Sequence, residues 1–200
     1  MCLLFESICI EKGIARNLSF HQERMKRSGG AVFGAVDFPV LEKLIHLPES
    51  LDQTRLIKCR VTYGRQIESI AYDYYSPRKI SSLKLVHDDH IEYPHKFLDR
   101  SDIDALFAQR GEADDILIVK NGLITDTSIA NICFYNGSRW ITPSSPLLCG
   151  TMRTSLLQTG MITERQIFAE DLADFTHICL INAMLKPLLN RKMPEIKIVF

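Results

Sequence analysis

The first third of the chain has the pattern of a small α/β unit. Residues 3–10 are rich in strand-forming side chains and stop at a polar turn. Because a hydroxyl can accept a hydrogen bond from an unpaired backbone N–H, Ser19 is predicted to cap a helix that begins near Phe20 and weakens or ends at Gly29-Gly30. Two β-branched and aromatic runs then predict a hairpin with its turn at Gly64-Arg65, and these runs are residues 55–63 and 66–72.

A break in the pattern after residue 75 predicts two domains. Pro77 lacks a backbone donor and restricts Ser76 to extended conformations. We therefore expect a small α/β domain at 1–75, a linker at 76–82 and a larger domain at 83–200. Asn121-Gly122 and Asn136-Gly137 are strong hairpin signals within the larger domain. Its predicted strands are 80–86, 114–119, 123–125, 131–135, 139–142, 178–182 and 196–200, and its predicted helices are 99–110, 152–158 and a short one near residue 171.

The fold class that follows is α/β or α+β, with an antiparallel meander in a barrel-like larger domain. The composition excludes several classes of function. The 24 basic and 24 acidic residues leave no net charge, which argues against a sequence-independent nucleic-acid binder. Six cysteines without a CxxC pair indicate reduced core thiols, and six histidines without repeated spacing indicate no metal site. No apolar run is long enough to span a bilayer, so a cytoplasmic protein without membrane contact is expected.

Common catalytic signatures are missing, because the sequence contains no GxGxxG, Walker loop, HExxH, GxSxG or EF-hand loop. Three polar clusters beside turns or strand ends remain as candidate chemistry. Each also has a structural explanation: a surface lysine, a turn carboxylate or an ordinary helix start. The clusters are His95-Lys96 with Asp99-Arg100, Asp126-Thr127-Ser128 before Asn131, and the helix start at 150–153.

Taken in order, these clusters resemble the class IV aminotransferases, the fold-type IV enzymes that carry pyridoxal 5′-phosphate. LFESICI is similar to the family's opening strand, HQERM to its H-x-x-R-[LM] helix, and HKFLDR to the segment of its Schiff-base lysine. GLITDTSIANICF and TPSSPLLCGTMR resemble its acidic strand and its phosphate-binding segment. The resemblance covers nearly the whole chain and is strongest to short members related to 4-amino-4-deoxychorismate lyase. It implies a two-domain fold with the cofactor in the cleft between the domains, and a homodimer.

The resemblance also implies a role for individual residues. Lys96 would link covalently to pyridoxal 5′-phosphate and move the proton at the reacting carbon. Arg24 would bind the phosphate. Asp126 would face the pyridine nitrogen and keep it protonated. The further cofactor-binding residues that the resemblance implies are Asn131, Gly150, Thr151, Met152, Asn182 and Ala183.

The family's usual residue at the pyridine position is Glu. Asp126 departs from this pattern, because its side chain is one methylene shorter. Three functions stay open. The first is a lyase that converts 4-amino-4-deoxychorismate to 4-aminobenzoate and pyruvate. The second is an aminotransferase acting on branched-chain or D-amino acids, and the third is a non-catalytic descendant of the fold. Arg60 either meets a carboxylate of the small amino substrate or is an exposed strand residue, and the sequence leaves it unassigned.

Overall fold

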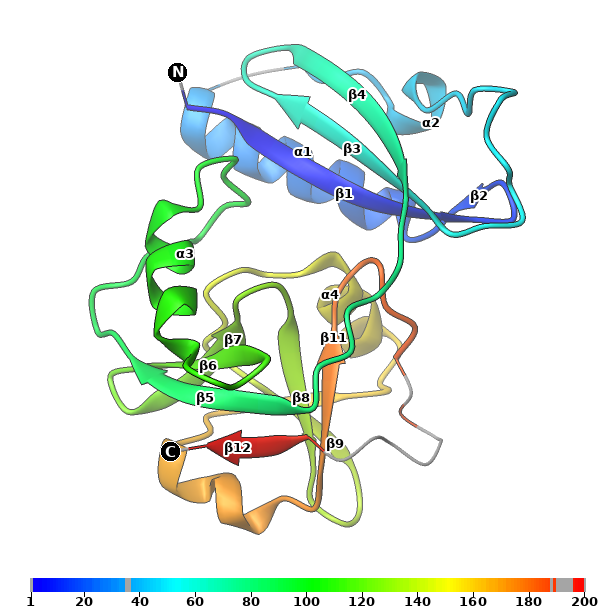
Figure 1. The fold of residues 1–200 in the computed structure, drawn as a ribbon. Coiled ribbons are helices and arrows are strands. Elements are labelled where there is room, and N and C mark those ends of the chain that lie inside the picture. The colour runs from blue at the N-terminus through cyan, green and yellow to red at the C-terminus, as the bar shows by residue number, and fades with distance from the viewer. Residues whose placement is uncertain (1, 35–36, 188, 190–195, 200) are drawn as a thin grey trace. The chain divides into compact units, whose positions relative to one another are not determined.

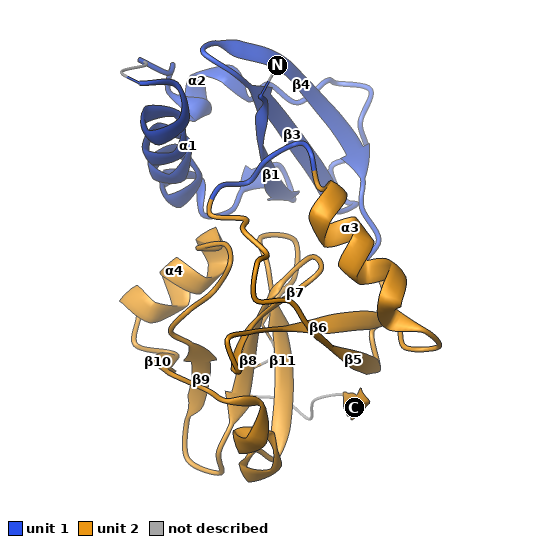
Figure 2. Ribbon diagram, turned by 90° about the vertical axis from the view of Figure 1, so that its left-hand side faces the viewer, with its two compact units in different colours: residues 1–77, 95–99 blue, residues 78–94, 100–200 orange. Residues whose placement is uncertain are grey.

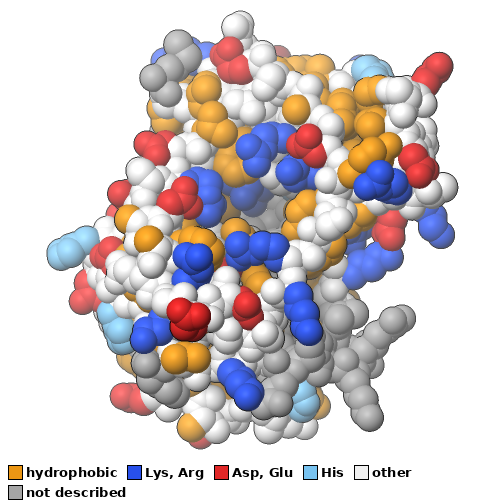
Figure 3. Space-filling view, in the orientation of Figure 1, with side chains coloured by type: hydrophobic (Ala, Val, Ile, Leu, Met, Phe, Trp, Pro, Cys, Tyr) orange, Lys and Arg blue, Asp and Glu red, His pale blue; other side chains and the backbone are white. Residues whose placement is uncertain are grey.

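The computed structural model describes residues 2–34, 37–187, 189 and 196–199. Its chain forms two compact units, which Figure 2 distinguishes by colour. One unit comprises Met1–Pro77 with His95–Asp99, and the other comprises Arg78–Pro94 with Arg100–Phe200. On the face shown in Figure 3, basic and acidic side chains are interspersed, in keeping with their equal numbers.

The first unit is a four-stranded antiparallel sheet with a long helix on one face (Figure 1). Its core joins apolar side chains of the sheet, among them Leu4 and Ile8, to Met25 of the helix. In spatial order the strands are β2 (Ile14–Ala15), β1 (Leu4–Glu11), β3 (Ile57–Tyr63) and β4 (Ile67–Tyr74), and the helices are α1 (Leu18–Phe33) and the short α2 (Leu41–Leu44). The predicted strand, helix and hairpin are confirmed, whereas β2 and α2 were not predicted.

Both predicted ends of α1 are wrong. The residue that precedes the helix is Asn17, in the left-handed conformation with φ 53°, and Ser19 lies inside the helix. Asparagine tolerates this conformation better than most residues. Gly29 does not weaken the helix, because it serves packing: a Cβ there would lie 2.2 Å from a ring carbon of Phe38. The helix instead ends before Gly34, whose φ of 83° favours glycine.

Residues 95–99 return to the first unit after the chain has begun the second. The Phe5 N–H donates to the Lys96 carbonyl at 3.0 Å, and the Leu98 N–H donates to the Leu3 carbonyl at 2.8 Å. These bonds extend the pairing of β1, so this short segment belongs to the first unit although the predicted larger domain, 83–200, contained it. Lys96 is thereby placed next to the start of β1.

The second unit is built on an eight-stranded mixed sheet (Figure 1). Strands β6 to β9 follow one another in antiparallel pairs, which confirms the meander, while β5 runs parallel to β6 and β12. The turn between β6 and β7 is the predicted one, with positive φ at both Asn121 and Gly122. The strands are β5 (Ser82–His87), β6 (Asp115–Lys120), β7 (Leu123–Thr127), β8 (Asn131–Tyr135), β9 (Trp140–Pro143), β10 (Thr163–Arg165), β11 (His177–Ile181) and β12 (Lys197–Val199).

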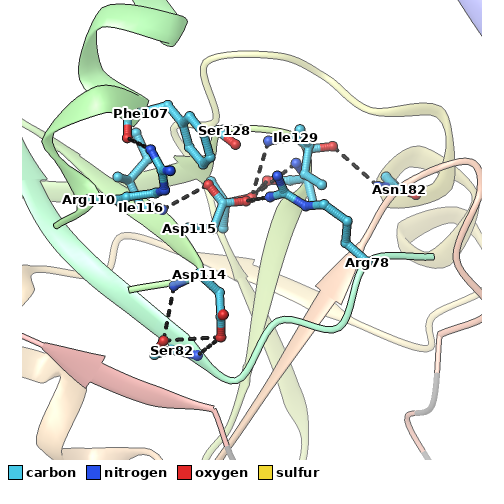
Figure 4. A network of polar contacts seen from close by, with 12 residues as sticks. Arg78, Ser82, Phe107, Arg110, Asp114, Asp115, Ile116, Ser128, Ile129 and Asn182 are labelled. Carbon is cyan, nitrogen blue, oxygen red and sulfur yellow. Dashed lines mark hydrogen bonds and ion pairs between the residues drawn. The ribbon is translucent and has the colours of Figure 1, made fainter. Parts of the chain in front are cut away.

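Helices α3 (Ser101–Phe107) and α4 (Thr151–Gln158) and the 3-10 turns Ala108–Arg110 and Ala169–Asp174 complete this unit. The short strand β10 was not predicted. Of the predicted last strand, 196–200, residue 200 lies outside the described residues. Asp114, the residue before β6, links the beginnings of β5 and β6. Its carboxylate accepts hydrogen bonds from Ser82, the first residue of β5, as Figure 4 shows. These bonds and those from Ser81 lower the pKa of Asp114 to about 2.

Candidate active site

Glu6 lies at the centre of a buried charged network in the first unit. Arg24 donates through Nε to Glu6 Oε1 at 2.9 Å and through Nη2 to the other carboxylate oxygen. His21 Nδ1 lies 2.6 Å from Glu6 Oε2. His21 and Arg24 stand three positions apart on α1 and therefore share the helix face that meets β1. All three side chains are buried, so the network is shielded from solvent.

Burial and charge oppose one another in setting the pKa of Glu6. Burial alone raises it, but Arg24 and His21 outweigh that effect and lower the pKa of Glu6 to about 2. For His21 burial dominates and lowers the pKa, although Glu6 partly offsets this. His21 is therefore neutral at pH 7 and donates its Nδ1–H to the Glu6 carboxylate. The fork of Arg24 is fixed in one orientation by Glu6.

Lys96 lies near this network in the same unit. Its Nζ atom is 4.6 Å from the centre of the Phe5 ring, and Phe5 precedes Glu6 on β1. The charge of Lys96 contributes to the lowered pKa of His21. The structure thus brings together two residues that the sequence singled out, Lys96 and Arg24, with the unforeseen Glu6 joined to Arg24.

Asp126 is the buried carboxyl of the second unit. It pairs in register with Asn131 of the next strand, and Asn131 Nδ2 donates to Asp126 Oδ1 at 2.7 Å. The Leu148 N–H donates to Asp126 Oδ2 at 2.9 Å. Burial raises the pKa of Asp126 to about 6, and the bonds from Leu148 and Asn131, with the charge of Arg153, offset this only in part. Asp126 is therefore a carboxyl held by amides rather than by a direct cation.

Gly150 immediately precedes α4, and its lack of a side chain is required. A Cβ at this position would lie 2.1 Å from Asn131 Oδ1, so any larger residue would displace Asn131. Thr151 and Met152 are buried in the first turn of α4, which contains no acidic residue. Backbone N–H groups at a helix N-terminus attract anions. The structure thus brings Asp126, Asn131 and the start of α4 together.

Asn182 acts chiefly within its own turn after β11. Its Oδ1 accepts the N–H groups of Met184 and Leu185 at 2.9 and 3.0 Å. Its Nδ2 donates to the Ile129 carbonyl at 3.3 Å, a contact drawn in Figure 4. Ala183 is a partly buried residue of the same turn. The contacts of Asn182 link this turn to the segment between Asp126 and Asn131.

Sequence reasoning gave no role to Glu6 or Arg153. Glu6 carried a signal, because a carboxylate inside the apolar run LFESICI needs a buried partner. Arg153 is buried and donates to the Pro143 carbonyl at 2.9 Å and to Glu164 at 2.7 Å. It therefore fixes the start of α4 against β9 and β10.

Each unit, taken by itself, has groups that suit part of a cofactor with a phosphate and a protonated ring nitrogen. The first unit supplies Arg24 and Lys96 around a single buried carboxylate. The second supplies the buried carboxyl of Asp126 and the glycine-started helix α4. Within the described residues, no group of three or more His, Cys, Asp or Glu side chains is arranged to hold a metal ion. Nor is any described helix both long and apolar enough to cross a membrane.

Comparison with known proteins agrees with this arrangement. The family model for amino-transferase class IV matches residues 3–188. An uncharacterised protein of Haemophilus influenzae is 47% identical over 183 residues, which are 90% of this chain and 97% of the relative.

Two solved structures have the same fold. One, from Haemophilus somnus and provisionally named a 4-amino-4-deoxychorismate lyase, is 38% identical with a TM-score of 0.84, over 92% of this chain and 97% of that one. The other is the pyridoxal-phosphate-bound form of a hypothetical aminotransferase from Mycobacterium tuberculosis, 19% identical with a TM-score of 0.71 over 92% of this chain and 78% of that one. The expected fold class, two mixed α/β units of fold type IV, is confirmed.

Proposed function

Since the chain belongs to the class IV aminotransferase family, we propose that it is a pyridoxal 5′-phosphate-dependent enzyme that acts on a small amino substrate. The single observation that carries this proposal is the buried Arg24, held by Glu6 in the same unit as Lys96. A buried arginine needs a strong reason to be there, and phosphate recognition through a fixed guanidinium is one.

Arg24 would bind the cofactor phosphate. Its Nε and Nη2 atoms donate to Glu6, so the orientation of the guanidinium plane is set before any ligand arrives. Preorganisation of this kind lowers the entropic cost of binding. The backbone N–H groups of Thr151 and Met152 would complete the phosphate site, with Gly150 keeping Asn131 close to the helix start.

Asp126 would face the pyridine nitrogen of the cofactor. A buried carboxyl with a pKa of about 6 and no direct cationic partner in the described part of the chain gains a favourable charge partner when a protonated ring nitrogen lies beside it. Asn131 and the Leu148 N–H orient the carboxylate and leave its position fixed between two strands and the loop before α4. Asn182 and Ala183 would support this loop region rather than supply charge.

Lys96 would hold the cofactor covalently and then move a proton at the reacting carbon of the substrate. When bound, pyridoxal 5′-phosphate acts as a sink for the electron pair left at that carbon. The protein's part would be to position Lys96, and the backbone bonds between residues 95–99 and the start of β1 support this role. The neutral His21 keeps a further positive charge away from this region.

We propose 4-amino-4-deoxychorismate as the substrate, with pyruvate and 4-aminobenzoate as products. The support is the 38% identity to the Haemophilus somnus protein over nearly its whole length. Transamination is the second candidate, because the Mycobacterium tuberculosis protein with the same fold is named an aminotransferase. The homodimer and the cytoplasmic location stay predictions.

The experiment that tests this proposal supplies the cofactor-loaded protein with aminodeoxychorismate and follows pyruvate release, with and without an oxo-acid acceptor. We expect pyruvate release without any acceptor. Amino-group transfer from glutamate to the oxo-acid acceptor, without release of pyruvate from aminodeoxychorismate, would assign an aminotransferase instead. A protein that binds the cofactor and performs neither reaction would be the non-catalytic descendant.

A further inference from the structure

Arg60 is a cation without an anionic partner among the described residues. It lies in the middle of β3, is only partly exposed, and its Nε atom is buried with no hydrogen-bond partner. Its guanidinium lies over the Phe5 ring, whose centre is 4.8 Å from Arg60 Cζ. A buried guanidinium nitrogen without an acceptor is costly, so Arg60 Nε needs an acceptor that the described residues do not supply, as do Arg153 Nε and Tyr63 Oη.

The neighbouring strands explain why Arg60 has no partner. The residues that pair with it are Ser7 on β1 and Ala71 on β4, both of which are small and uncharged. Lys58, two positions earlier on the same face of β3, has Asp73 opposite and forms an ion pair with it at 3.6 Å. The sheet thus places an acidic residue opposite Lys58 and none opposite Arg60.

Phe5 links Arg60 to the reactive lysine. Arg60 Cζ and Lys96 Nζ both lie within 5 Å of the centre of this ring, at 4.8 and 4.6 Å. The Phe5 ring therefore places the Arg60 guanidinium in the neighbourhood of the Lys96 amine. An amino substrate would bring its amine to the cofactor carbon that Lys96 holds, so any carboxylate that the substrate carries would lie in the neighbourhood of the Phe5 ring.

We propose that Arg60 binds a carboxylate of the amino substrate and so determines specificity for carboxylate-bearing amines. The inference rests on the proposed function, because it needs the substrate amine at Lys96. A guanidinium suits this task, since it presents parallel N–H donors that match a carboxylate. Phe5 supports the guanidinium from one side, which limits the conformations that binding must freeze.

The test measures equilibrium binding to the cofactor-loaded protein by calorimetry, with 4-aminobenzoate as the carboxylate probe and 4-aminobenzamide as its uncharged counterpart. The variants are Arg60→Met, which keeps an apolar stem against Phe5, and Arg60→Lys, which keeps the charge without the fork. Lys58→Met is the matched control, because it removes a cation from the same strand and face. Absorbance of the bound cofactor is recorded for every variant.

We expect Arg60→Met to weaken 4-aminobenzoate binding about tenfold to hundredfold, Arg60→Lys to weaken it less, and Lys58→Met to leave it unchanged. Binding of the benzamide should not depend on Arg60. Equal affinity for the carboxylate in wild type and Arg60→Met, or no carboxylate binding to the loaded wild type, would overturn the inference. Lost cofactor loading in Arg60→Met would do so as well, since Arg60 would then serve the cofactor. Failure of the wild type itself to load would instead refute the proposed function.

Discussion

Glu6 and Asp126 are both buried carboxyls in candidate binding positions, yet their pKa values are shifted in opposite directions. Burial raises the pKa of each, but the pKa of Glu6 ends at about 2 and that of Asp126 at about 6. The difference lies in their direct partners. Glu6 accepts from a guanidinium and an imidazole, whereas Asp126 accepts from a side-chain amide and a backbone N–H.

This difference indicates different roles for the two carboxyl groups. A carboxylate that is already paired with a cation is complete without a ligand and serves to orient that cation. A carboxyl that lacks a direct cation is ready to receive one. On this account Glu6 is a positioning residue for Arg24, and Asp126 awaits the positive ring nitrogen of the cofactor.

The largest expected effect is on stability. Glu6→Gln leaves Arg24 buried without its carboxylate, and it should lower the free energy of unfolding by about 3–5 kcal/mol. Asp126→Asn should cost at most about 1 kcal/mol, the value of one hydrogen bond, because no cation loses a direct partner and the neutral amide avoids burying a charge. Denaturant unfolding of both variants in the cofactor-free protein measures this contrast. Equal losses would contradict the distinction between the two carboxyls.

A smaller effect is expected on catalysis at Asp126. Asp126→Asn should still load the cofactor at saturating concentration, through Lys96 and Arg24, but with weaker affinity, because a charge-assisted bond to the ring nitrogen contributes roughly 1.5–3 kcal/mol. Turnover of the loaded variant should fall about tenfold to hundredfold, because the neutral amide no longer favours the protonated ring nitrogen. Asp126→Glu, which keeps the charge, is the matched control and should retain more turnover. Turnover and cofactor absorbance are measured on the same samples. Wild-type turnover with asparagine would reduce Asp126 to a turn residue.

Arg24→Lys tests the role of the guanidinium that Glu6 orients. Lysine keeps the charge beside Glu6 but lacks the planar fork, so cofactor affinity should fall about tenfold while the protein stays folded. Arg27→Lys changes an exposed arginine of the same helix and should leave the affinity unchanged. Titration with pyridoxal 5′-phosphate gives the dissociation constants. Unchanged affinity in Arg24→Lys would mean that another group binds the phosphate.

The smallest effect is the slope of stability with pH. The folded pKa of Asp126 is raised above its ordinary 3.8, so cofactor-free protein should gain stability as pH falls from about 6 to 4, by at most about 1.4 kcal/mol per pH unit. The folded pKa of Glu6 is lowered from 4.5, so its contribution is present above pH 4.5 and is lost as pH falls towards 2. Unfolding curves across this range should lose the first slope in Asp126→Asn and the second in Glu6→Gln. A slope that survives in the matching variant would contradict the assignment.

Local signals were enough for much of the fold. Alternating strands and the Asn121-Gly122 turn were predicted because side-chain period and positive φ are properties of a few adjacent residues. The helix start at Leu18 was missed, since the left-handed backbone of the preceding Asn17 replaces the side-chain cap that Ser19 was expected to supply. The return of residues 95–99 to β1 was missed for another reason: it depends on pairing across most of the first unit.

The candidate site also has features that local sequence predicts and features that it does not. Lys96, Arg24 and Asp126 were found through motifs, each of which is a short stretch of sequence. The pairing of Glu6 with Arg24 joins residues 18 positions apart on a strand and a helix, and no local pattern encodes it. The lack of an acidic residue opposite Arg60 likewise depends on which residues the sheet pairs with it. It could be predicted only if the register of the strands were known.

The most direct test of the account is the identity of the lysine that holds the cofactor. Protein loaded with pyridoxal 5′-phosphate is reduced with borohydride, digested and mapped by mass spectrometry, with Lys96→Ala treated in parallel. The account predicts the reduced adduct on Lys96 in the wild type and none in the variant. An adduct on Lys84, Lys120 or Lys186, or a Lys96→Ala protein that still forms one at the wild-type level, would contradict it.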